Sequence, residues 1–424
     1  MALLQGKRPR NIKFSNHKAV FSVLREHENM SVGEISREVH LSNTAVSRIL
    51  SVLQERGMVL PTGKGESSTE GGKPPVLFSV SRNYKYAMVL IADVVNCDCY
   101  VYDVQYKVQS HIKYAYGNCL YSEFVEKCAC AMQEAVREAR ISPEQLYGCC
   151  IAAPGIIDSV NGEIMYPVWR PEWGKNLPFC RDLKRSLPFE IDLILENNSR
   201  LGSFVEFDGL EEERRRGICV GLFGPDDLHN VPGVGGFIRD NRAIRRGMNG
   251  YAGEFGHLTV DYQNEEMCIC GRRGCLQTLT SPERMLSYAR ERREKYPDSI
   301  LWKLQQHRSL VVKDIFEASN RGDMLAMEVV DIAAKYYSRV IETIILTVDP
   351  ETIIIGGCFS TAGDYFLNRL NAQLHHANLF GFVSNLQIQY ARYARAEALP
   401  FGAAKYLFDL YFNMDETFDE KTAN

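Results

Sequence analysis

The chain has 424 residues, of which 45% are hydrophobic and 24% charged, a length that favours two or three domains and a composition typical of globular proteins. No apolar run is long enough to span a bilayer, and the first residues lack the apolar core of a secretion signal. The 13 cysteines are odd in number and scattered, which is not typical of a secreted disulfide scaffold. We therefore expect a cytoplasmic protein. The net charge of −4 is unevenly spread, because residues 1–80 carry 11 Lys and Arg against 7 Asp and Glu, and this mildly basic head suggests an anionic partner.

Residues 16–60 predict a helix-turn-helix. A first helix with apolar residues at helical spacing is followed by Ser31 and Glu34, the Ser-x-x-Glu pattern of a capping box at the start of a short second helix. Residues 40–42 form a tight turn, and a third helix follows and ends at Gly57.

The third helix is expected to have one apolar and one polar face. The apolar stripe consists of Val46, Ile49, Leu50 and Leu53. The polar residues opposite to it are Asn43, Thr44, Ser47 and Arg48. Short polar groups and an Arg can reach base edges or phosphates in a major groove. They also suit an ordinary solvated face, so this pattern alone leaves both interpretations open.

The segment after the third helix predicts a β-hairpin wing, because a tip rich in Gly, Ser and Lys lies between two short apolar runs. Lys64 and Lys73 would lie at its basic tip, where such wings follow the DNA backbone or enter the minor groove. The sequence GGKPP marks a domain boundary near residue 80. The wing favours double-stranded DNA as the partner of the head.

Beyond the head, apolar runs with strand character alternate with helical segments, which predicts an α/β fold. Several of these runs end in polar or glycine-rich loops, among them YAMVLIADVVN, LYGCCIAAPG, LILENNS and ETIIIGG. Ligands of α/β proteins bind beyond the carboxyl ends of the strands, so the ligand cleft is expected at these loops.

A compact set of metal ligands lies in the second half of the chain. His257 precedes the motif CICGRRGC, which contains Cys268, Cys270 and Cys275. One imidazole and three thiols complete a tetrahedral set for Zn²⁺, and a closed set of this kind is usually structural. A redox pair is less favoured because the motif lacks Cys-x-x-Cys. A lone histidine among unrelated cysteines is the remaining alternative.

The motifs AGEFGH and CICGRRGCLQ, preceded by a winged helix-turn-helix, resemble the ROK family (repressor, open reading frame, kinase) from about residue 13 to the end of the chain. The chain is most similar to the sugar-responsive repressor branch, which includes xylose and N-acetylglucosamine repressors. The resemblance implies a two-lobed actin/hexokinase-like (ribonuclease H-like) fold, a sugar bound between the lobes, a structural zinc ion, and a homodimer or tetramer.

With this fold in mind, we expect three domains. Residues 1–82 would form the winged helix-turn-helix, residues 83–199 the first α/β lobe, and residues 200–424 the second lobe with the zinc loop. The C-terminal helix is expected to return to the first lobe.

The resemblance also exposes departures from the kinases of the family. Their Glu-Asn-Asp-Ala-Asn-like motif, whose Asp is the general base, is here Glu196-Asn197-Asn198-Ser199-Arg200. An amide at position 198 cannot accept the proton of a sugar hydroxyl at neutral pH. The Asp-x-Gly-Gly-Thr turn that binds ATP corresponds to Asp93-Val94-Val95-Asn96-Cys97, which has no glycine, and a second glycine-rich turn carries extra residues. Only Gly356-Gly357 keeps its ordinary form. We therefore expect no enzyme activity.

The sugar-contact positions of the family are better kept. They map onto Gly155, Asn197, Asn198, Glu254 and His257, and Gln277 stands where the family usually has Glu. Amides and carboxylates at fixed angles suit sugar hydroxyls, and His257 would bind zinc with one nitrogen and face the sugar with the other. An alternative is that Glu254 and Gln277 only brace the zinc loop.

From the resemblance we expect a DNA-binding transcriptional regulator of carbohydrate genes. We expect it to act as a repressor and to respond to a sugar or sugar derivative. Two alternatives stay open at this point. One is an active sugar kinase with a DNA-binding head, and the other is a regulator whose ROK domain only dimerises.

Overall fold

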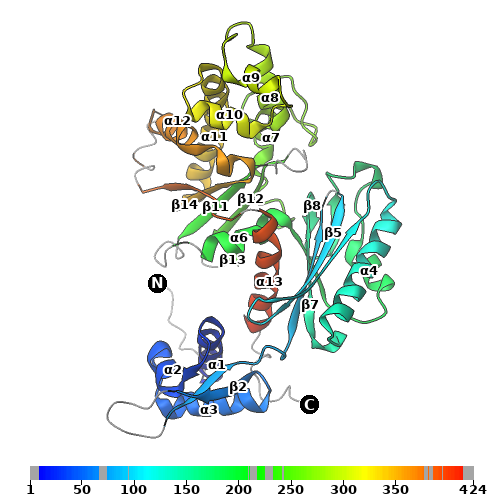
Figure 1. Ribbon diagram of the computed structural model, residues 1–424, viewed down its shortest axis with the longest axis vertical. Coiled ribbons are helices and arrows are strands. Elements are labelled where there is room, and N and C mark those ends of the chain that lie inside the picture. Colours follow the sequence, from blue (N-terminus) through cyan, green and yellow to red (C-terminus); the bar gives the residue numbers. More distant parts are fainter. Residues whose placement is uncertain are drawn as a thin grey trace. The chain divides into compact units, whose positions relative to one another are not determined.

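The structure is a computed structural model that describes residues 9–65, 74–93, 95–208, 210, 217–224, 233–240, 243–376, 381, 385–393 and 395–413. The chain divides into two compact units (Figure 1). The first comprises Met1–Ile151, Phe179–Ile194 and Ala403–Asn424, and the second comprises Ala152–Pro178 and Leu195–Gly402. The finer division into three domains at residues 82 and 199 stays a prediction.

The N-terminal part of the first unit is a winged helix-turn-helix. Its elements are α1 (Pro9–Glu26), β1 (Met30–Ser31), α2 (Val32–Val39), α3 (Asn43–Glu55), β2 (Val59–Lys64) and β3 (Val76–Val80). The strands form an antiparallel sheet in the order β1-β3-β2. Gly57 has a φ of 68°, a left-handed conformation that glycine adopts without strain, and it follows α3 as predicted.

The predicted capping box is confirmed at the start of α2. The Ser31 hydroxyl accepts a hydrogen bond from the Glu34 N–H, and the Glu34 carboxylate accepts one from the Ser31 N–H at 2.8 Å. These two bonds satisfy N–H groups that a helix N-terminus otherwise leaves without partners. The pKa of the Glu34 carboxyl group is lowered by the hydrogen bonds that the Ser31 N–H and the Ser31 hydroxyl donate to it.

Replacing Ser31 with alanine is expected to destabilise the head by about 1 kcal/mol, because the orphan N–H of Glu34 loses its acceptor. Urea titration followed by circular dichroism measures this difference. The matched control is Ser51→Ala on the exposed side of α3, where a change within about 0.5 kcal/mol is expected. An equal loss in both variants would contradict the role of the capping box.

A five-stranded sheet follows the head, in the order β10-β7-β4-β5-β6, in which β5 pairs antiparallel with both β4 and β6. Its strands are β4 (Tyr86–Ala92), β5 (Asn96–Asp103), β6 (Val108–Ala115), β7 (Leu146–Ala153) and β10 (Leu193–Asn197). Helix α4 (Tyr121–Ala139) packs against β5 and β6, and α5 (Phe179–Ser186) packs against α4. Cys97, Cys99 and Cys128 are fully buried here, so these thiols serve as small apolar side chains.

The last helix, α13 (Arg395–Asn413), completes the core of the head. The Phe412 ring lies 4.7 Å from the Phe21 ring of α1, centroid to centroid, and both side chains are buried. Arg25 of α1 forms an ion pair with Asp409 at 3.7 Å. The two ends of the sequence therefore share one packed core within the first unit.

The second unit contains a mixed five-stranded sheet in the order β13-β12-β11-β14-β15. Its strands are β11 (Ile218–Phe223), β12 (Gly235–Asp240), β13 (Ala243–Ile244), β14 (Thr352–Gly356) and β15 (Gln387–Tyr390). Strand β11 pairs antiparallel with β12 and parallel with β14. A small antiparallel hairpin, β8 (Ile156–Asp158) with β9 (Glu163–Tyr166), belongs to the same unit.

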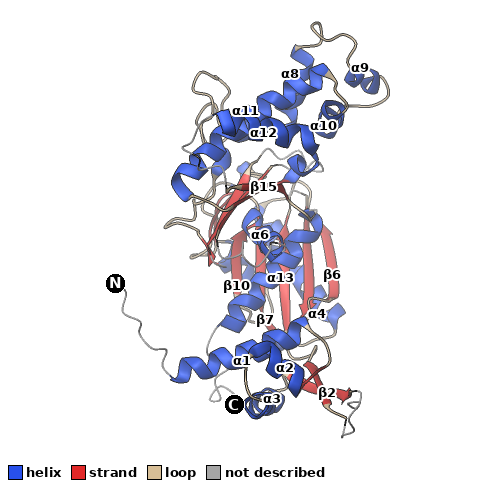
Figure 2. Ribbon diagram, turned by 90° about the vertical axis from the view of Figure 1, so that its left-hand side faces the viewer, coloured by secondary structure: helices blue, strands red, loops and turns tan. Residues whose placement is uncertain are grey.

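Helices α6 (Asn198–Asp208), α11 (Met324–Val348) and α12 (Gly363–His376) cover the two faces of this sheet. The unit also contains α7 (Leu276–Leu279), α8 (Pro282–Glu291), α9 (Ile300–Gln305) and α10 (Val312–Asn320). Of these, α9 packs against α10, whereas α8 and α10 pack against α11. Figures 1 and 2 show α11 and α12 along one face and α6 on the other. Because neighbouring residues of a strand point to opposite faces, Ile353 and Ile355 of β14 join the core of α11 and α12, whereas Ile354 packs with Phe207 of α6.

None of the helices in the described parts of the chain combines the length and the apolar character that crossing a membrane requires.

Candidate metal and effector site

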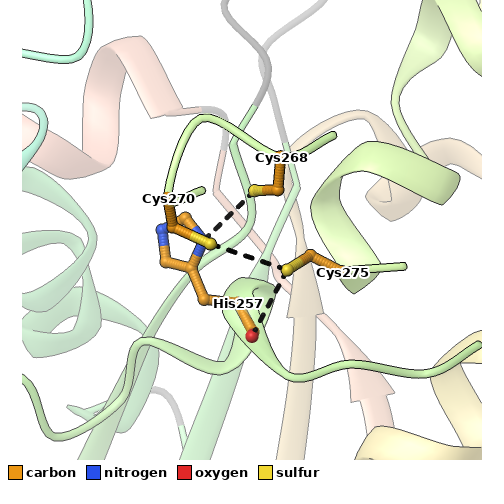
Figure 3. A group of neighbouring side chains, drawn as sticks. All are labelled: His257, Cys268, Cys270 and Cys275. Carbon is orange, nitrogen blue, oxygen red and sulfur yellow. Dashed lines mark hydrogen bonds between the residues drawn. The ribbon is translucent and has the colours of Figure 1, made fainter. Parts of the chain in front are cut away.

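The four predicted metal ligands come together in the second unit (Figure 3). His257 ends the short 3₁₀ helix η4 (Phe255–His257), Cys268 and Cys270 lie in the following loop, and Cys275 caps α7. All four ligand atoms lie within 4.8 Å of one another. Cys268 Sγ is 3.5 Å from His257 Nδ1, and Cys270 Sγ is 3.7 Å from Cys275 Sγ.

The separations of 3.5 Å and 3.7 Å fit the edges of a tetrahedral zinc site. With Zn–S bonds of about 2.3 Å and a Zn–N bond of about 2.0 Å, the edges of the tetrahedron are about 3.8 Å between sulfurs and about 3.5 Å between sulfur and nitrogen. The residues present can therefore hold Zn²⁺, and a site with four protein ligands leaves no open position for catalysis.

The local backbone explains how so short a loop brings three thiols together. The Gly271 N–H donates to the Cys268 carbonyl at 2.9 Å, and the Cys268 N–H donates to the Arg272 carbonyl at 2.8 Å, which folds the segment into a tight turn. Gly274 has a φ of 68°, and a Cβ there would lie 1.9 Å from the Asp261 carbonyl oxygen. Only glycine fits this approach, which returns the chain to Cys275.

The electrostatics of the cluster favour deprotonation of the Cys268 thiol and oppose that of Cys275. Burial opposes ionisation of the Cys268 thiol, but hydrogen bonds led by the one to His257 lower its pKa to about 6. The same hydrogen bond raises the pKa of His257. Burial and the neighbouring Cys268 charge raise the pKa of Cys275 to about 12. A bound cation would remove this repulsion, and metal binding would release protons.

Gln277 lies against this cluster. Its side chain is buried, and its amide Nε2 lies 3.4 Å from Cys268 Sγ, within reach of donating a hydrogen bond to a thiolate. This contact agrees with the interpretation of Gln277 as a brace of the metal loop. A sugar-contact role of Gln277 stays a prediction.

Replacing Gln277 with leucine is expected to weaken zinc affinity on the order of 10-fold, since groups that hydrogen-bond metal ligands typically contribute 10–100-fold. Competition with a chromophoric chelator measures the affinity. Thr280→Val is the control for a local change of packing, because the Thr280 hydroxyl donates to the Leu276 carbonyl and not to a metal ligand. An unchanged affinity in Gln277→Leu would mean that the contact does not orient Cys268.

The predicted sugar-contact residues lie on segments that the sheet brings together. Strands β7 and β10 are neighbours, so Gly155, which follows β7, lies close to Asn197 at the end of β10. The Asn197 amide donates to the Gly155 carbonyl at 3.0 Å, and its Oδ1 accepts from the Ser199 N–H at 2.8 Å. The Asn197 side chain thus ties two loops together. Asn198, the first residue of α6, is 8% exposed.

Glu254 is largely shielded from solvent, and this burial raises the pKa of its carboxyl group, while Arg200 and His257 oppose the shift. Its backbone carbonyl accepts a hydrogen bond from the His257 N–H at 3.1 Å, which links it directly to the metal loop.

Sequence reasoning missed a charged network beside these residues. The Glu196 carboxylate is fully buried and forms ion pairs with Arg200 at 3.1 Å and with Arg246 at 2.5 Å. The i, i+4 spacing of Glu196 and Arg200 is a sequence signal for the first pair. The ion pair between Glu196 and Arg246, which lies fifty residues further along the chain, has no comparable signal in the sequence.

The predicted DNA-contact residues lie on one exposed face of α3. Asn43, Thr44, Ser47 and Arg48 are all exposed, whereas the apolar stripe opposite to them is buried. Lys64 is exposed at the end of β2. Lys73 lies outside the described residues.

Comparison with known proteins agrees with this architecture. The xylose repressor of Caldicellulosiruptor bescii is 24% identical over 395 residues, covering 90% of this chain and 92% of that protein. A glucokinase of Halalkalibacterium halodurans is 32% identical over 231 residues, 53% of this chain and 66% of the kinase. The crystal structure of a ROK family transcriptional regulator, a homologue of the E. coli MLC protein, has a TM-score of 0.75 at 19% identity and covers 96% of this chain and 98% of its own.

The structural likeness confirms the predicted fold class, an α/β protein with an N-terminal winged helix-turn-helix and a two-lobed sugar-kinase-like body. The IclR helix-turn-helix domain matches residues 19–62, and the ROK family matches residues 121–406. Since the latter match covers more than half of the 424 residues, the chain belongs to the ROK family.

Proposed function

We propose that this protein is a DNA-binding transcriptional regulator that represses carbohydrate genes. Its binding to DNA would be controlled by a sugar or sugar derivative. The observation that carries the proposal is the exposed polar face of α3, presented by a winged helix-turn-helix in the same chain as a ROK domain. A relative that covers 90% of the chain is named a xylose repressor, whereas the glucokinase covers 53% of it. A DNA-binding role also implies a cytoplasmic location.

The proposal includes the absence of sugar kinase activity. Asn198 stands at the general-base position, and an amide cannot take a proton from a hydroxyl at neutral pH. At the Gly356-Gly357 loop, the Phe223 ring lies so close to Gly356 that a Cβ there would be 2.4 Å from it. The ring therefore packs against the first glycine of the one glycine pair that is kept from the kinases.

The proposed zinc ion is structural. When bound, it would fix the loop of His257, Cys268, Cys270 and Cys275 beside Glu254, so that metal binding supports the effector site without taking part in chemistry. The proposed effector contacts are Gly155, Asn197, Asn198, Glu254, His257 and Gln277.

The proposed mechanism is a linkage between two binding events. A homodimer or tetramer without sugar binds a palindromic operator through two recognition helices, and the sugar binds more tightly to the state that does not bind DNA. Sugar binding then lowers the affinity for DNA by the same factor by which DNA binding lowers the affinity for the sugar.

The test begins with a thermal-shift panel of the zinc-loaded protein with D-xylose, D-glucose, N-acetyl-D-glucosamine and the 6-phosphates of the two hexoses. A DNA ligand is then selected from a random duplex library, and its affinity is measured with and without each sugar at one salt concentration. A sugar-dependent loss of affinity supports the proposal. Operator affinity that no sugar changes would refute effector control and favour a ROK domain that only dimerises.

Two further measurements address the other parts of the proposal. ADP release from ATP with each free sugar would identify an active kinase with a DNA-binding head, and none is expected. Light scattering of the protein alone and with operator distinguishes a homodimer from a tetramer.

A further inference from the structure

Arginine side chains mostly lie at the protein surface, whereas that of Arg200 is buried and hydrogen-bonded. Its side chain is 1% exposed, and Nη1 donates to Glu196 Oε1 at 3.1 Å. Its Nη2 donates to the backbone carbonyls of Gly250 and Ala252, the latter at 3.1 Å. One guanidinium therefore joins the end of β10 to a loop that lies about fifty residues further along the chain.

The loop that Arg200 holds leads directly to Glu254 and His257. Gly250 is held from its other side as well, since a Cβ there would lie 2.8 Å from the Ile157 carbonyl oxygen of β8. Arg246, at the start of the loop, forms an ion pair with the second oxygen of Glu196. The carboxylate of Glu196 thus anchors the loop twice, once directly through Arg246 and once through Arg200.

The physical chemistry makes Arg200 the stronger of these two ties. A buried charge is stable only when it is paired and hydrogen-bonded, and the planar fork of Arg can satisfy a carboxylate and two carbonyls together. Arg246 is 30% exposed, so solvent screens its ion pair. Without Arg200, two loop carbonyls and one oxygen of Glu196 would lose donors in a buried setting.

We propose that Arg200 is a positioning residue of the effector site. It holds the carbonyls of Gly250 and Ala252, and thereby fixes the position of the following Glu254 relative to Asn198 at the start of α6. The inference rests on the proposed function for the nature of the site. The family's motif has Asn where this chain has Arg200, so the brace is a feature of this sequence rather than of the motif. Lysine cannot replace it fully, because a single ammonium group lacks the planar fork.

The first experiment needs no sugar. Hydrogen–deuterium exchange of residues 246–254 is measured in the full-length, zinc-loaded protein for the wild type, Arg200→Gln, Arg200→Lys and Arg239→Gln. Arg239 is the matched control because its guanidinium is also buried in the second unit, between the rings of Phe204 and Phe207.

Arg200→Gln is expected to raise exchange in residues 246–254 at least about 10-fold, and Arg200→Lys to give an intermediate value, as expected for loss of buried hydrogen bonds to charge. Arg239→Gln is expected to lower the melting temperature while leaving exchange in this segment at the wild-type level. Equal exchange in Arg200→Gln and Arg239→Gln would overturn the proposal. If Arg200→Gln does not fold, Arg200→Lys carries the test, and exchange at the wild-type level overturns it.

The second experiment uses whichever of D-xylose, D-glucose and N-acetyl-D-glucosamine shifts the melting temperature of the wild type. Arg200→Gln is expected to weaken its affinity at least 10-fold more than Arg239→Gln does, with zinc content unchanged in both. Equal affinities would remove Arg200 from the effector site. If none of the sugars shifts the wild type, sugar control fails, whereas the exchange result still decides whether Arg200 positions the loop.

Discussion

Cys275→Ser is expected to lose zinc binding, with an affinity reduced by more than about 100-fold, because replacing a ligand should exceed the 10–100-fold effect of changing a group that only orients one. Cys275 is fully buried, and it occupies the N-cap position of α7. Its loss leaves three donors and no cation to offset the charge of the remaining thiolates. Zinc content after dialysis against a chelator, measured by mass spectrometry, tests this.

Two further variants distinguish the loss of a metal ligand from a general effect of removing a cysteine thiol. Cys270→Ser changes an exposed ligand and is expected to lose zinc as well. Cys130→Ser changes an exposed cysteine of α4 and should keep about one zinc per chain. Full zinc content in Cys270→Ser would remove this residue from the ligand set. A normal sugar response in metal-free protein would remove the coupling between zinc and effector.

Arg48→Glu is expected to weaken operator binding by at least about 30-fold, because a contact to a base or phosphate is lost and a like charge then faces the DNA. Arg48 lies on the exposed face of α3, where the fold does not need it. The affinity is measured by fluorescence anisotropy on the selected operator at several salt concentrations. A contact to phosphate would lower the salt slope by about one, whereas a contact to a base would relax sequence preference.

The matched control is Arg181→Glu, an exposed residue of α5 that changes the net charge by the same amount. It should leave operator affinity within about twofold of the wild type, since exposed charges far from a partner are screened. A similar loss in both variants would assign the effect to overall charge, and the assignment of α3 as the recognition helix would then fail.

Local signals in the sequence predicted the head and the metal loop well. The capping box of Ser31 and Glu34 and the helix end at Gly57 depend on residues a few positions apart, so their patterns can be recognised directly. The ligands of the metal loop are nearly as local, and only His257 had to be joined to the cysteines across a short gap. Such features depend little on the rest of the fold.

The effector site was less predictable because its geometry depends on distant contacts. Asn197 was predicted as a sugar contact, and the structure shows its amide tied to Gly155 and Ser199, which leaves its role toward a sugar a prediction. Arg200 donates hydrogen bonds to backbone carbonyls that lie about fifty residues further along the chain. The positions of these carbonyls cannot be predicted from a pattern of side chains. Kinase-like motifs predict where an effector site would lie, but the packing between the motifs could be described only from the fold.

The core shared by α1 and α13 bears on how such regulators can evolve. Phe21 near the start of the chain packs against Phe412 near its end, so the DNA-binding head is not an independent N-terminal cassette. A new head acquired by fusion at the N-terminus would leave Phe412 and its neighbours without their apolar partner. DNA specificity should therefore change by substitution on the exposed face of α3, or by joint replacement of the segments that contain α1 and α13.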